Sequence, residues 1–311
     1  MSALTRLVVL LGPTASGKSE LAVRLAQELD GEILACDSTQ VYRHFDIGTG
    51  KVPLLERREI PHHLIDIVEP AEVFTAGDYA TRATATLADV TARGKLPIIT
   101  AGTGLYLRAL IEGLSDAPAR SEELRERLRR RGRVKSALHL HALLARIDPE
   151  VAKRIAPRDT QKIIRAIEMR ILAGKAVGEV HRAGRKGLDG YAVTKIGLIP
   201  ARDALYQRIH ARVENMIAGG WLDEVRRLID QGVPREAKPF QFIGYTQLRE
   251  HLEGRLPLNV AIDSIQQATR RYAKRQLTWF RREPGVHGLA GFGDAPGIAS
   301  EALSLIAGVR I

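Results

Sequence analysis

A glycine-rich loop near the beginning of the chain constrains the fold more than any other stretch. Residues 12–19 read GPTASGKS and match G-x-x-x-x-G-K-[ST], in which glycines let backbone N–H groups curl around an anion. An apolar run at residues 7–11 precedes the loop and a helical pattern at residues 18–29 follows it, as a phosphate-binding loop requires. We therefore expect a phosphoryl or diphosphate ligand held by Gly12, Pro13, Thr14, Ala15, Ser16, Gly17, Lys18 and Ser19.

Two side chains of this loop have expected roles of their own. Lys18 would reach the outer phosphate oxygens as a mobile point charge, and the Ser19 hydroxyl would ligate Mg²⁺, the expected cofactor. The motif alone does not separate kinases, nucleoside triphosphatases and transferases that release diphosphate.

Strand and helix patterns alternate over the first part of the chain. Because the strand runs are apolar throughout rather than alternating, they predict an α/β fold like that of P-loop nucleoside triphosphatases, with a parallel sheet flanked by helices. Thr75 and Asp78 form a plausible capping box for one of the helices. The expected elements are strands at residues 7–11, 33–36 and 97–100 and helices at 18–29 and 78–92.

From residue 118 the pattern changes to short, charged helices. They are expected at residues 122–131, 135–147, 149–155 and 160–173. A strand at residues 192–199 then returns to the first part, followed by helices at 204–217, 221–230 and 260–282. We expect a catalytic core domain of residues 1–117 and 191–311 and an all-helical, basic insertion domain of residues 118–190 that contacts its partner.

The net charge of +11 is concentrated in the expected insertion. Residues 120–190 carry 19 Lys and Arg against 9 Asp and Glu, a net charge of +10. This asymmetry favours a polyanionic partner larger than a metabolite, most simply a nucleic acid, over a helical surface that is merely solvated.

The remaining composition narrows the class of protein. The single cysteine, Cys36, excludes an internal disulfide and a Cys-rich zinc site, and it favours a reducing cytosol. We expect Cys36 to act as a buried small hydrophobe. No apolar run is long enough to span a bilayer, so we expect no membrane partner, and we expect the chain to act as a monomer.

Polar residues follow two of the expected strands. Asp37 comes directly after the strand at residues 33–36, and Thr103 lies in a glycine-flanked turn after the strand at 97–100. In open parallel sheets the chemistry gathers at the carboxyl ends of the strands. A carboxylate there could hold Mg²⁺, position a hydroxyl or act as a general base, although an isolated Asp-Ser pair is also a common helix N-cap.

Seven stretches of the chain, in order and from Gly12 to Arg281, resemble the tRNA dimethylallyltransferase (isopentenyl-tRNA transferase, or IPP transferase) family. They read GPTASGKS, DSTQVYRHFDIGTGK, PHHLIDI, AGTGLYLRALIEGL, DTQKIIRAIE, FQFIGYTQL and YAKRQLTWFR. The resemblance implies transfer of a dimethylallyl group from dimethylallyl diphosphate to N6 of the adenosine at position 37 of tRNAs that read codons beginning with U. Diphosphate is the expected second product.

The resemblance also implies which residues act. Asp37 matches the family's catalytic aspartate and fits a general base that takes the N6 proton. Lys18, the loop N–H groups and Mg²⁺ on Ser19 would stabilise the departing diphosphate, and Thr103 matches a threonine that contacts the target nucleotide. The stretch LYQRIHARVENM offers two candidates for a second cation on the diphosphate, Arg208 and Arg212.

The expected tRNA surface follows from the same resemblance. The base pocket would be lined, beside Asp37, by Ser38, Thr39 and Gln40. Contacts from the insertion would come from Arg125, Gln161, Lys162, Ile163, Ile164 and Arg165. A later loop would add Gln241, Phe242, Ile243, Gly244, Tyr245 and Thr246. An adenosine inside a loop must leave its stack before N6 can enter a deep site, and a separate helical unit would assist this.

Other interpretations of the same residues stay open. In a small-molecule P-loop kinase Asp37 would position an acceptor hydroxyl, but the basic insertion would have no role. The insertion is equally unnecessary for prenylation of free adenine nucleotides, and a nucleic-acid-binding ATPase would hydrolyse ATP without any transfer. His62 and His63 lack a third ligand at metal spacing and are expected to be structural, while Trp279 and Phe280 are expected in the core.

Overall fold

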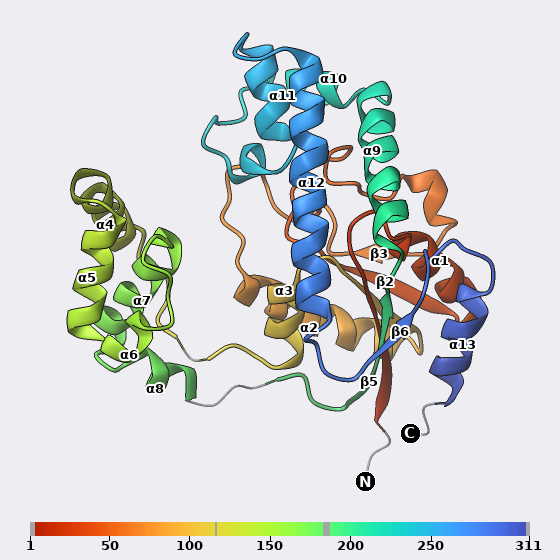
Figure 1. Ribbon diagram of the computed structural model, residues 1–311. Coiled ribbons are helices and arrows are strands. Elements are labelled where there is room, and N and C mark those ends of the chain that lie inside the picture. Colours follow the sequence, from red (N-terminus) through yellow and green to blue (C-terminus); the bar gives the residue numbers. More distant parts are fainter. Residues whose placement is uncertain (1–3, 116, 183–186, 309–311) are drawn as a thin grey trace. The chain divides into compact units, whose positions relative to one another are not determined.

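A computed structural model describes residues 4–115, 117–182 and 187–308, and the chain divides into two compact units (Figure 1). The α/β unit consists of Met1–Leu110 and Leu188–Ile311, and the helical unit of Ile111–Gly187. The sequence pattern placed the inserted segment at residues 118–190, so both junctions lie somewhat earlier in the chain than the pattern indicated.

The α/β unit contains a six-stranded sheet with the order β3-β2-β4-β1-β5-β6, and all its pairs are parallel. The strands are β1 (Thr5–Leu11), β2 (Gly31–Cys36), β3 (His62–His63), β4 (Leu96–Ala101), β5 (Tyr191–Leu198) and β6 (Val286–Leu289). The parallel sheet expected from the sequence is confirmed, and the strand that follows the helical unit lies beside β1. The short strands β3 and β6 were not expected.

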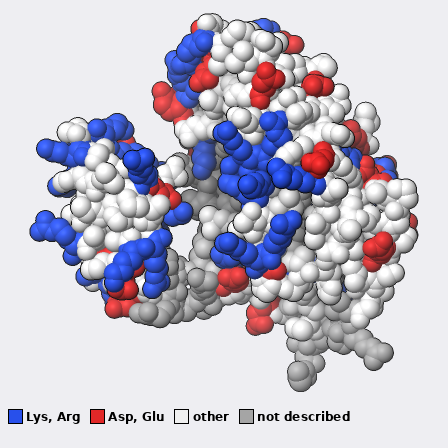
Figure 2. Space-filling view, in the orientation of Figure 1, with Lys and Arg blue, Asp and Glu red and all other residues white. Residues whose placement is uncertain are grey.

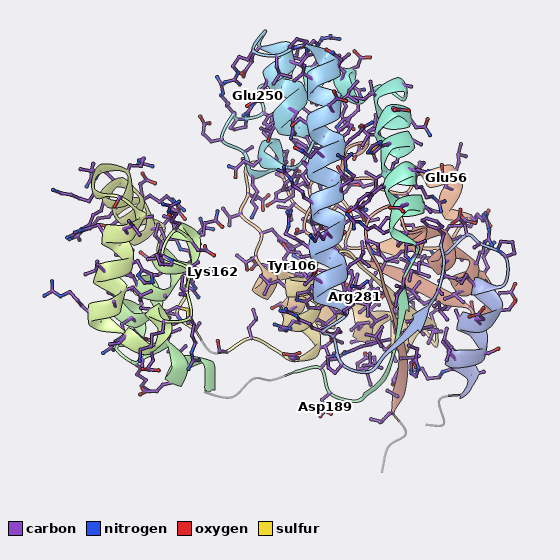
Figure 3. The ribbon with its side chains drawn as sticks, in the orientation of Figure 1. Glu56, Tyr106, Lys162, Asp189, Glu250 and Arg281 are labelled. Atoms are coloured by element: carbon purple, nitrogen blue, oxygen red, sulfur yellow. The ribbon has the colours of Figure 1, made fainter. Side chains whose placement is uncertain are left out.

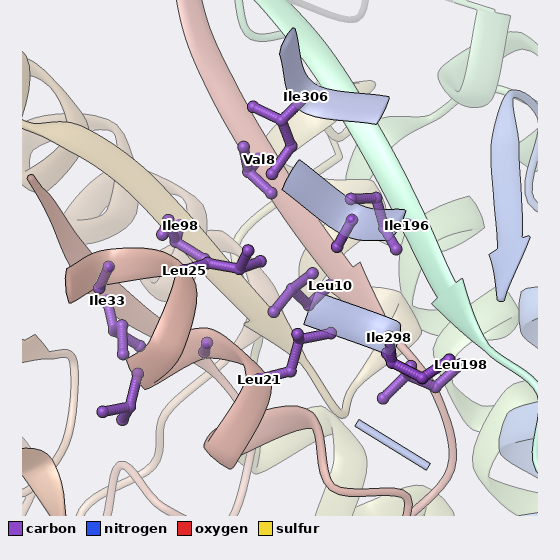
Figure 4. Close-up of a cluster of buried hydrophobic side chains, with 14 of the residues drawn as sticks. Val8, Leu10, Leu21, Leu25, Ile33, Ile98, Ile196, Leu198, Ile298 and Ile306 are labelled. Atoms are coloured by element: carbon purple, nitrogen blue, oxygen red, sulfur yellow. The ribbon is translucent and has the colours of Figure 1, made fainter. Parts of the chain in front are cut away.

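Apolar side chains cover both faces of this sheet. On one face, α1 (Lys18–Glu28) and α13 (Ile298–Gly308) pack on alternate residues of the strands (Figure 4), which include Val8, Leu10, Ile33, Ile98, Ile196 and Leu198. The intervening residues are equally buried: Leu7, Val9, Leu11, Leu34 and Ile99. On that side α2 (Ala76–Ala92) packs against β4, and its capping box of Thr75 and Asp78 is confirmed. Burial of both faces explains why the strands read as continuous apolar runs.

The other helices of the α/β unit gather around one long helix, α12 (Leu258–Phe280). Both α9 (Arg202–Ala218) and α11 (Tyr245–Leu252) pack on α12, and α10 (Trp221–Asp230) packs on both of them. In Figure 1 α12 runs from this group down to α3 (Gly104–Ile111), which follows β4. Figure 2 shows Lys and Arg side chains gathered over α12, whose exposed basic residues are Arg271, Lys274 and Arg275.

The helical unit is built from α4 (Glu122–Lys135), α5 (Ala137–Ile147), α6 (Pro149–Ala152), α7 (Thr160–Ala173) and α8 (Val177–Arg182). Its core includes Leu128, Leu140, Leu144, Ile163 and Ile167. The four helices expected here are confirmed with shifted ends. For example, α4 continues to Lys135 because Ser136, at φ +95°, ends that helix and caps α5 through His139 N.

In the part of the chain that the structure describes, no helix combines the length and the apolar character needed to cross a bilayer.

Candidate active site

The phosphate loop lies between β1 and α1 and is closed from behind by a distant segment. Gly12 and Gly17 have φ of +156° and +82°, and Gly17 is the N-cap of α1. A Cβ on Gly17 would lie 2.8 Å from the N of Gly293, whose N–H donates to Ser16 O at 2.8 Å. Only glycine therefore fits this contact, and the segment beyond β6 supports the loop.

Lys18 lies at the start of α1 with its ammonium turned onto the loop. Nζ donates to the carbonyls of Gly12 and Pro13 at 2.7 and 2.8 Å. Burial lowers the pKa of Lys18 from 10.5 to about 7, with Asp37 opposing the shift and Arg212 adding to it. The ammonium is therefore poised to lose or gain a proton near neutral pH, and an anion in the loop would favour its charged form.

The two arginines of α9 named from the sequence have different surroundings. Arg208 lies over the Phe292 ring, 4.6 Å from its centroid, and donates to both carboxylate oxygens of Asp294, with Nη1–Oδ1 at 2.8 Å. Asp294 raises the pKa of Arg208 and neutralises it. Arg212 is half-buried and forms no ion pair with a described residue. Burial lowers its pKa, and the attraction of Asp37 only partly offsets this.

Asp37 and Thr103 meet at the carboxyl ends of β2 and β4. Asp37 Oδ1 accepts hydrogen bonds from Thr39 N at 2.8 Å and Thr39 Oγ1 at 2.6 Å, so Asp37 caps a turn rather than a helix. Thr103 Oγ1 accepts from Ser38 N at 3.0 Å and donates to Ser38 Oγ at 3.2 Å. The N–H groups of Gly102 and Thr103 both donate to Cys36 O at 3.0 Å. The two strand ends thus form one rigid corner.

The loop that contains Ile47 and Gly48 is held in place by α10 and α11, and it forms a further part of the site. Buried Glu224 accepts from Ile47 N at 2.8 Å and from the Tyr245 hydroxyl at 2.6 Å. The Tyr245 oxygen in turn accepts from Gly48 N at 3.1 Å. Trp221 packs so closely on Gly48 that a Cβ there would overlap the indole. The loop position therefore depends on buried polar and aromatic groups from distant helices.

Many of these groups line one cleft of about 1430 Å³ within the α/β unit. Phosphate-loop residues 14–19 and the strand-end residues 37–40 share it with Arg208 and Arg212. Apolar side chains line it as well, among them Ile47, Val213, Met216 and Trp221. Pockets for a single small ligand are typically about 300–1,000 Å³. The cleft has room for an anionic group and a second ligand beside a carboxylate.

Comparison with known proteins agrees with this arrangement. Residues 40–283 match the family model described as IPP transferase. The chain is 51% identical over 301 residues to a tRNA dimethylallyltransferase of Solibacter usitatus, covering 97% of this chain and 98% of that one. Against a tRNA dimethylallyltransferase of Koribacter versatilis the identity is 49% over 300 residues, covering 96% and 97%. The chain belongs to the IPP transferase family.

Solved structures support the same assignment. The full-length tRNA isopentenylpyrophosphate transferase of Bacillus halodurans superposes with a TM-score of 0.71 at 37% identity, covering 97% of each chain. A eukaryotic dimethylallyltransferase acting on tRNA gives a TM-score of 0.83 at 26% identity, covering 99% of this chain and 81% of that one. The family resemblance and the fold class predicted from the sequence are confirmed.

The residues expected in the base pocket lie together. Ser38 and Thr39 are bonded to Thr103 and Asp37 as described, and Gln40 Nε2 donates to Gly50 O at 3.1 Å. Asp37, Ser38, Thr39 and Gln40 all line the cleft. Thr103 is not in the lining, but Gly102, the residue before it, is. Their contacts with a nucleotide stay a prediction.

The later loop expected to touch tRNA divides into two parts. Gln241, Phe242 and Ile243 line the cleft, and Thr246 is half-buried at the start of α11. Gly244 and Tyr245 are buried, and Trp221 packs on Gly244, whose φ is +92°. These two residues therefore support the wall of the cleft and do not face the interior of the cleft.

In the helical unit the expected contact residues are also divided. Arg125 and Arg165 donate to the buried carboxylate of Glu168 at 2.7 and 2.6 Å. Burial opposes ionisation of Glu168, but these bonds and one from Ser121 N lower its pKa to about 2. Both arginines thus have a partner inside their own unit.

The first turn of α7 supplies the remaining expected contacts. Ile163 and Ile164 are buried in the core of the helical unit, which withdraws both side chains from its surface. Gln161 and Lys162 are exposed, and Lys162 is labelled in Figure 3. A surface for tRNA on this turn would therefore come from the two polar side chains.

Several minor expectations are settled by the packing. Cys36 is fully buried, and burial raises its pKa to about 12. Phe280 is buried, whereas Trp279 is half-buried against Gly104 and Arg108, so the core prediction holds only for Phe280. His63 Nε2 bonds to Glu32 Oε2 at 2.7 Å. Among the described residues there is no cluster of three or more His, Cys, Asp or Glu that could hold a metal.

Sequence reasoning missed several residues of the cleft. Tyr272 and Gln276 of α12 both donate to Gly102 O, at 3.2 and 2.7 Å. Trp221 of the cleft and the segment 292–294, which supports the phosphate loop from outside the cleft, were missed as well. Tyr272 and Gln276 lie in the stretch YAKRQLTWFR, which carried the family resemblance, but no local pattern indicates that α12 passes over the ends of β2 and β4.

Proposed function

We propose that this protein transfers a dimethylallyl group from dimethylallyl diphosphate to N6 of the adenosine at tRNA position 37, in tRNAs that read codons beginning with U, and releases diphosphate. The observation that supports this most directly is the single cleft in which the phosphate loop and the Asp37 corner face the same space. A diphosphate bound by the loop would leave the attached carbon beside the carboxylate.

On the diphosphate side, we assign Lys18 and Arg212 as the principal cations. The C–O bond of an allylic diphosphate breaks readily when the departing negative charge is stabilised. Lys18 and Arg212 are partly buried cations without an ion-pair partner among the described residues, whereas Arg208 is already neutralised by Asp294. Partly buried, unpaired cations interact strongly with an incoming anion because little solvent screens them.

Mg²⁺ fits the residues at this end of the cleft. Mg²⁺ usually keeps several waters and takes one or two protein ligands together with phosphate oxygens. The Ser19 hydroxyl is exposed at the first turn of α1 and lines the cleft, and Asp37 lies in the same lining. Ser19 and the substrate's own oxygens would hold the ion, which would add positive charge to the leaving group.

On the acceptor side, Asp37 would take a proton. The N6 amine of adenine is a poor nucleophile because its lone pair is delocalised into the ring. As the bond from N6 to the prenyl carbon forms and the bond from that carbon to the diphosphate oxygen breaks, one N6 proton passes to the Asp37 carboxylate. Thr39 holds Asp37 Oδ1, and Thr103 is placed beside Asp37 through Ser38.

The test supplies the pure protein with Mg²⁺, labelled dimethylallyl diphosphate and unmodified tRNA, followed by digestion and nucleoside analysis. We expect label in a prenylated adenosine from the anticodon loop. Label that stays out of tRNA, together with ATP consumption in the presence of a small alcohol, would favour a kinase instead.

A further inference from the structure

A buried amide on α12 connects the two sides of the cleft. Gln276 Oε1 accepts a hydrogen bond from Thr14 N at 2.8 Å, and its Nε2 donates to Gly102 O at 2.7 Å. The side chain is 6% exposed. Tyr272, one turn earlier on α12, donates its hydroxyl to the same Gly102 carbonyl at 3.2 Å. One amide therefore spans from β4 to the phosphate loop.

Both anchors of this amide adjoin groups of the proposed reaction. Thr14 belongs to the phosphate loop of residues 12–19, which contains Lys18. Gly102 directly precedes Thr103, and a Cβ on Gly102 would overlap Asp37 Oδ2. A shift of the Gly102 peptide would therefore move Thr103 and alter the packing of the carboxylate. A shift of Thr14 would move the backbone that surrounds the diphosphate.

We propose that Gln276 is a positioning residue that fixes the distance between the phosphate loop and the corner formed by Asp37 and Thr103. This inference rests on the proposed function, because the distance matters only if a group passes from the loop toward the corner. Misplacing reacting atoms by about 1 Å can reduce a rate by about 10²-fold. A buried bridge between both sides limits such displacement.

The chemistry of the amide makes the proposal testable. Bridging a backbone N–H and a backbone carbonyl requires an acceptor and a donor on one side chain, which glutamine provides. A carboxylate of the same length can accept from Thr14 N, but it can donate to Gly102 O only when it is protonated. Methionine has a similar length and no donor.

The experiment measures kcat and KM for both substrates in wild type, Gln276→Met and Gln276→Glu between pH 5.5 and 8.5, a window of about three units across which a buried carboxyl with a raised pKa would titrate. We expect Gln276→Met to lower kcat about 10²-fold while both KM values change by less than about threefold. For Gln276→Glu we expect the ratio of its kcat to that of wild type to rise by up to about tenfold per unit of falling pH. If the kcat of folded Gln276→Glu recovers as the pH falls, its loss at higher pH results from misplaced groups and not from a loss of stability.

The matched control is Gln267→Glu, an exposed position on the same helix. We expect it to keep the wild-type kcat at every pH. A folded Gln276→Met variant with wild-type kcat, or a kcat ratio for Gln276→Glu that is independent of pH, would overturn the proposal. Wild-type protein that transfers no prenyl group would overturn the proposed function, and this inference with it.

Discussion

Two cations of the cleft, Lys18 and Arg212, differ from many basic side chains of the helical unit in how their charges are balanced. In the cleft, Lys18 and Arg212 are partly buried, have lowered pKa values and form no ion pair with a described residue. In the helical unit, many basic side chains are paired with acids of the same unit, among them Arg120, Arg125, Arg129, Arg133, Lys153, Lys162 and Arg165.

This difference shows that net charge and available charge are separate quantities. The segment with a net charge of +10 neutralises part of its basic surface internally, and exposed arginines such as Arg127, Arg130, Arg154 and Arg158 remain without an ion pair in the described structure. Such side chains can attract the phosphates of a nucleic acid at long range. In the cleft, burial makes Lys18 and Arg212 responsive to a bound anion. We therefore propose that the cleft carries out the chemistry and that the helical unit attracts tRNA electrostatically.

The largest expected effect tests the chemical half of this division. Asp37→Asn should lower kcat by about 10²–10⁴-fold, because the amide cannot take the N6 proton. Affinity for tRNA, measured by filter binding, should stay within a few-fold of wild type. If affinity fell in proportion to turnover, Asp37 would be a binding residue and the division would fail.

A second substitution tests the internal pairing of the helical unit. Glu168→Gln should destabilise that unit by about 3–5 kcal/mol, because Arg125 and Arg165 lose a buried anionic partner. In wild type the pKa of Glu168 is lowered from 4.5 to about 2. The stabilising effect of Glu168 is therefore present above pH 4.5 and is lost as the pH falls through about 2. Chemical denaturation of wild type and variant at pH 7 and at acid pH measures the loss of stability and its pH dependence. An unchanged midpoint at pH 7 would show that the pairs contribute little.

The two arginines of α9 allow a direct test within the cleft. Arg212→Gln should lower kcat/KM for dimethylallyl diphosphate by about 10²-fold, because a half-buried cation with no ion pair among the described residues is lost. Arg208→Gln should lower it by less than about tenfold, since Asp294 already neutralises Arg208. The reverse order would assign the diphosphate to Arg208 and would mean that its pair with Asp294 opens during catalysis.

The pH dependence of diphosphate binding tests the assignment of Lys18. Its pKa is about 7 in the free protein and should rise when an anion binds, so binding takes up a proton above pH 7. Affinity for inorganic diphosphate should therefore fall by up to about tenfold per pH unit above 7. Calorimetry in buffers of different ionisation enthalpy counts the protons, and Lys18→Arg, which stays charged, is the control. Equal proton uptake in both proteins would exclude Lys18 as the source.

The smallest expected effect concerns single arginines of the helical unit. Log affinity for tRNA should fall linearly with log salt, and Arg127→Gln or Arg130→Gln should each reduce the slope by about 0.7–0.9. Lys95→Gln, at the amino end of β4 and paired with Asp30, is the control and should leave the slope unchanged. A slope that none of these variants alters would remove α4 from the tRNA surface.

The features that could be predicted from the sequence are those that produce a local sequence pattern. The phosphate loop, the parallel sheet and the polar residues after β2 and β4 follow from spacing and from continuous apolar runs, since β-strands buried on both faces require such runs. The strand at β5 was predicted in the same way. Strands as short as β3, with two residues, carry too little pattern to be recognised.

The features that could not be predicted depend on tertiary contacts. Arg208 and Arg212 are four residues apart on one helix, but Arg208 contacts Phe292 and Asp294, which are distant in the sequence, and Arg212 does not pair with Asp294. Gln276 reads as an ordinary polar position until α12 is seen beside Thr14 and Gly102. Ile163 and Ile164 are next to exposed polar residues, so their burial became evident only from the packing of α7.

A single-turnover experiment tests the central claim most directly, namely that one cleft releases diphosphate and modifies adenosine in the same event. Enzyme in excess over tRNA would be mixed with dimethylallyl diphosphate and Mg²⁺ and quenched at successive times, and both products would be counted. We predict equal amounts of diphosphate and prenylated adenosine, formed with the same rate constant. Diphosphate that appears while the anticodon-loop adenosine stays unmodified would contradict the account.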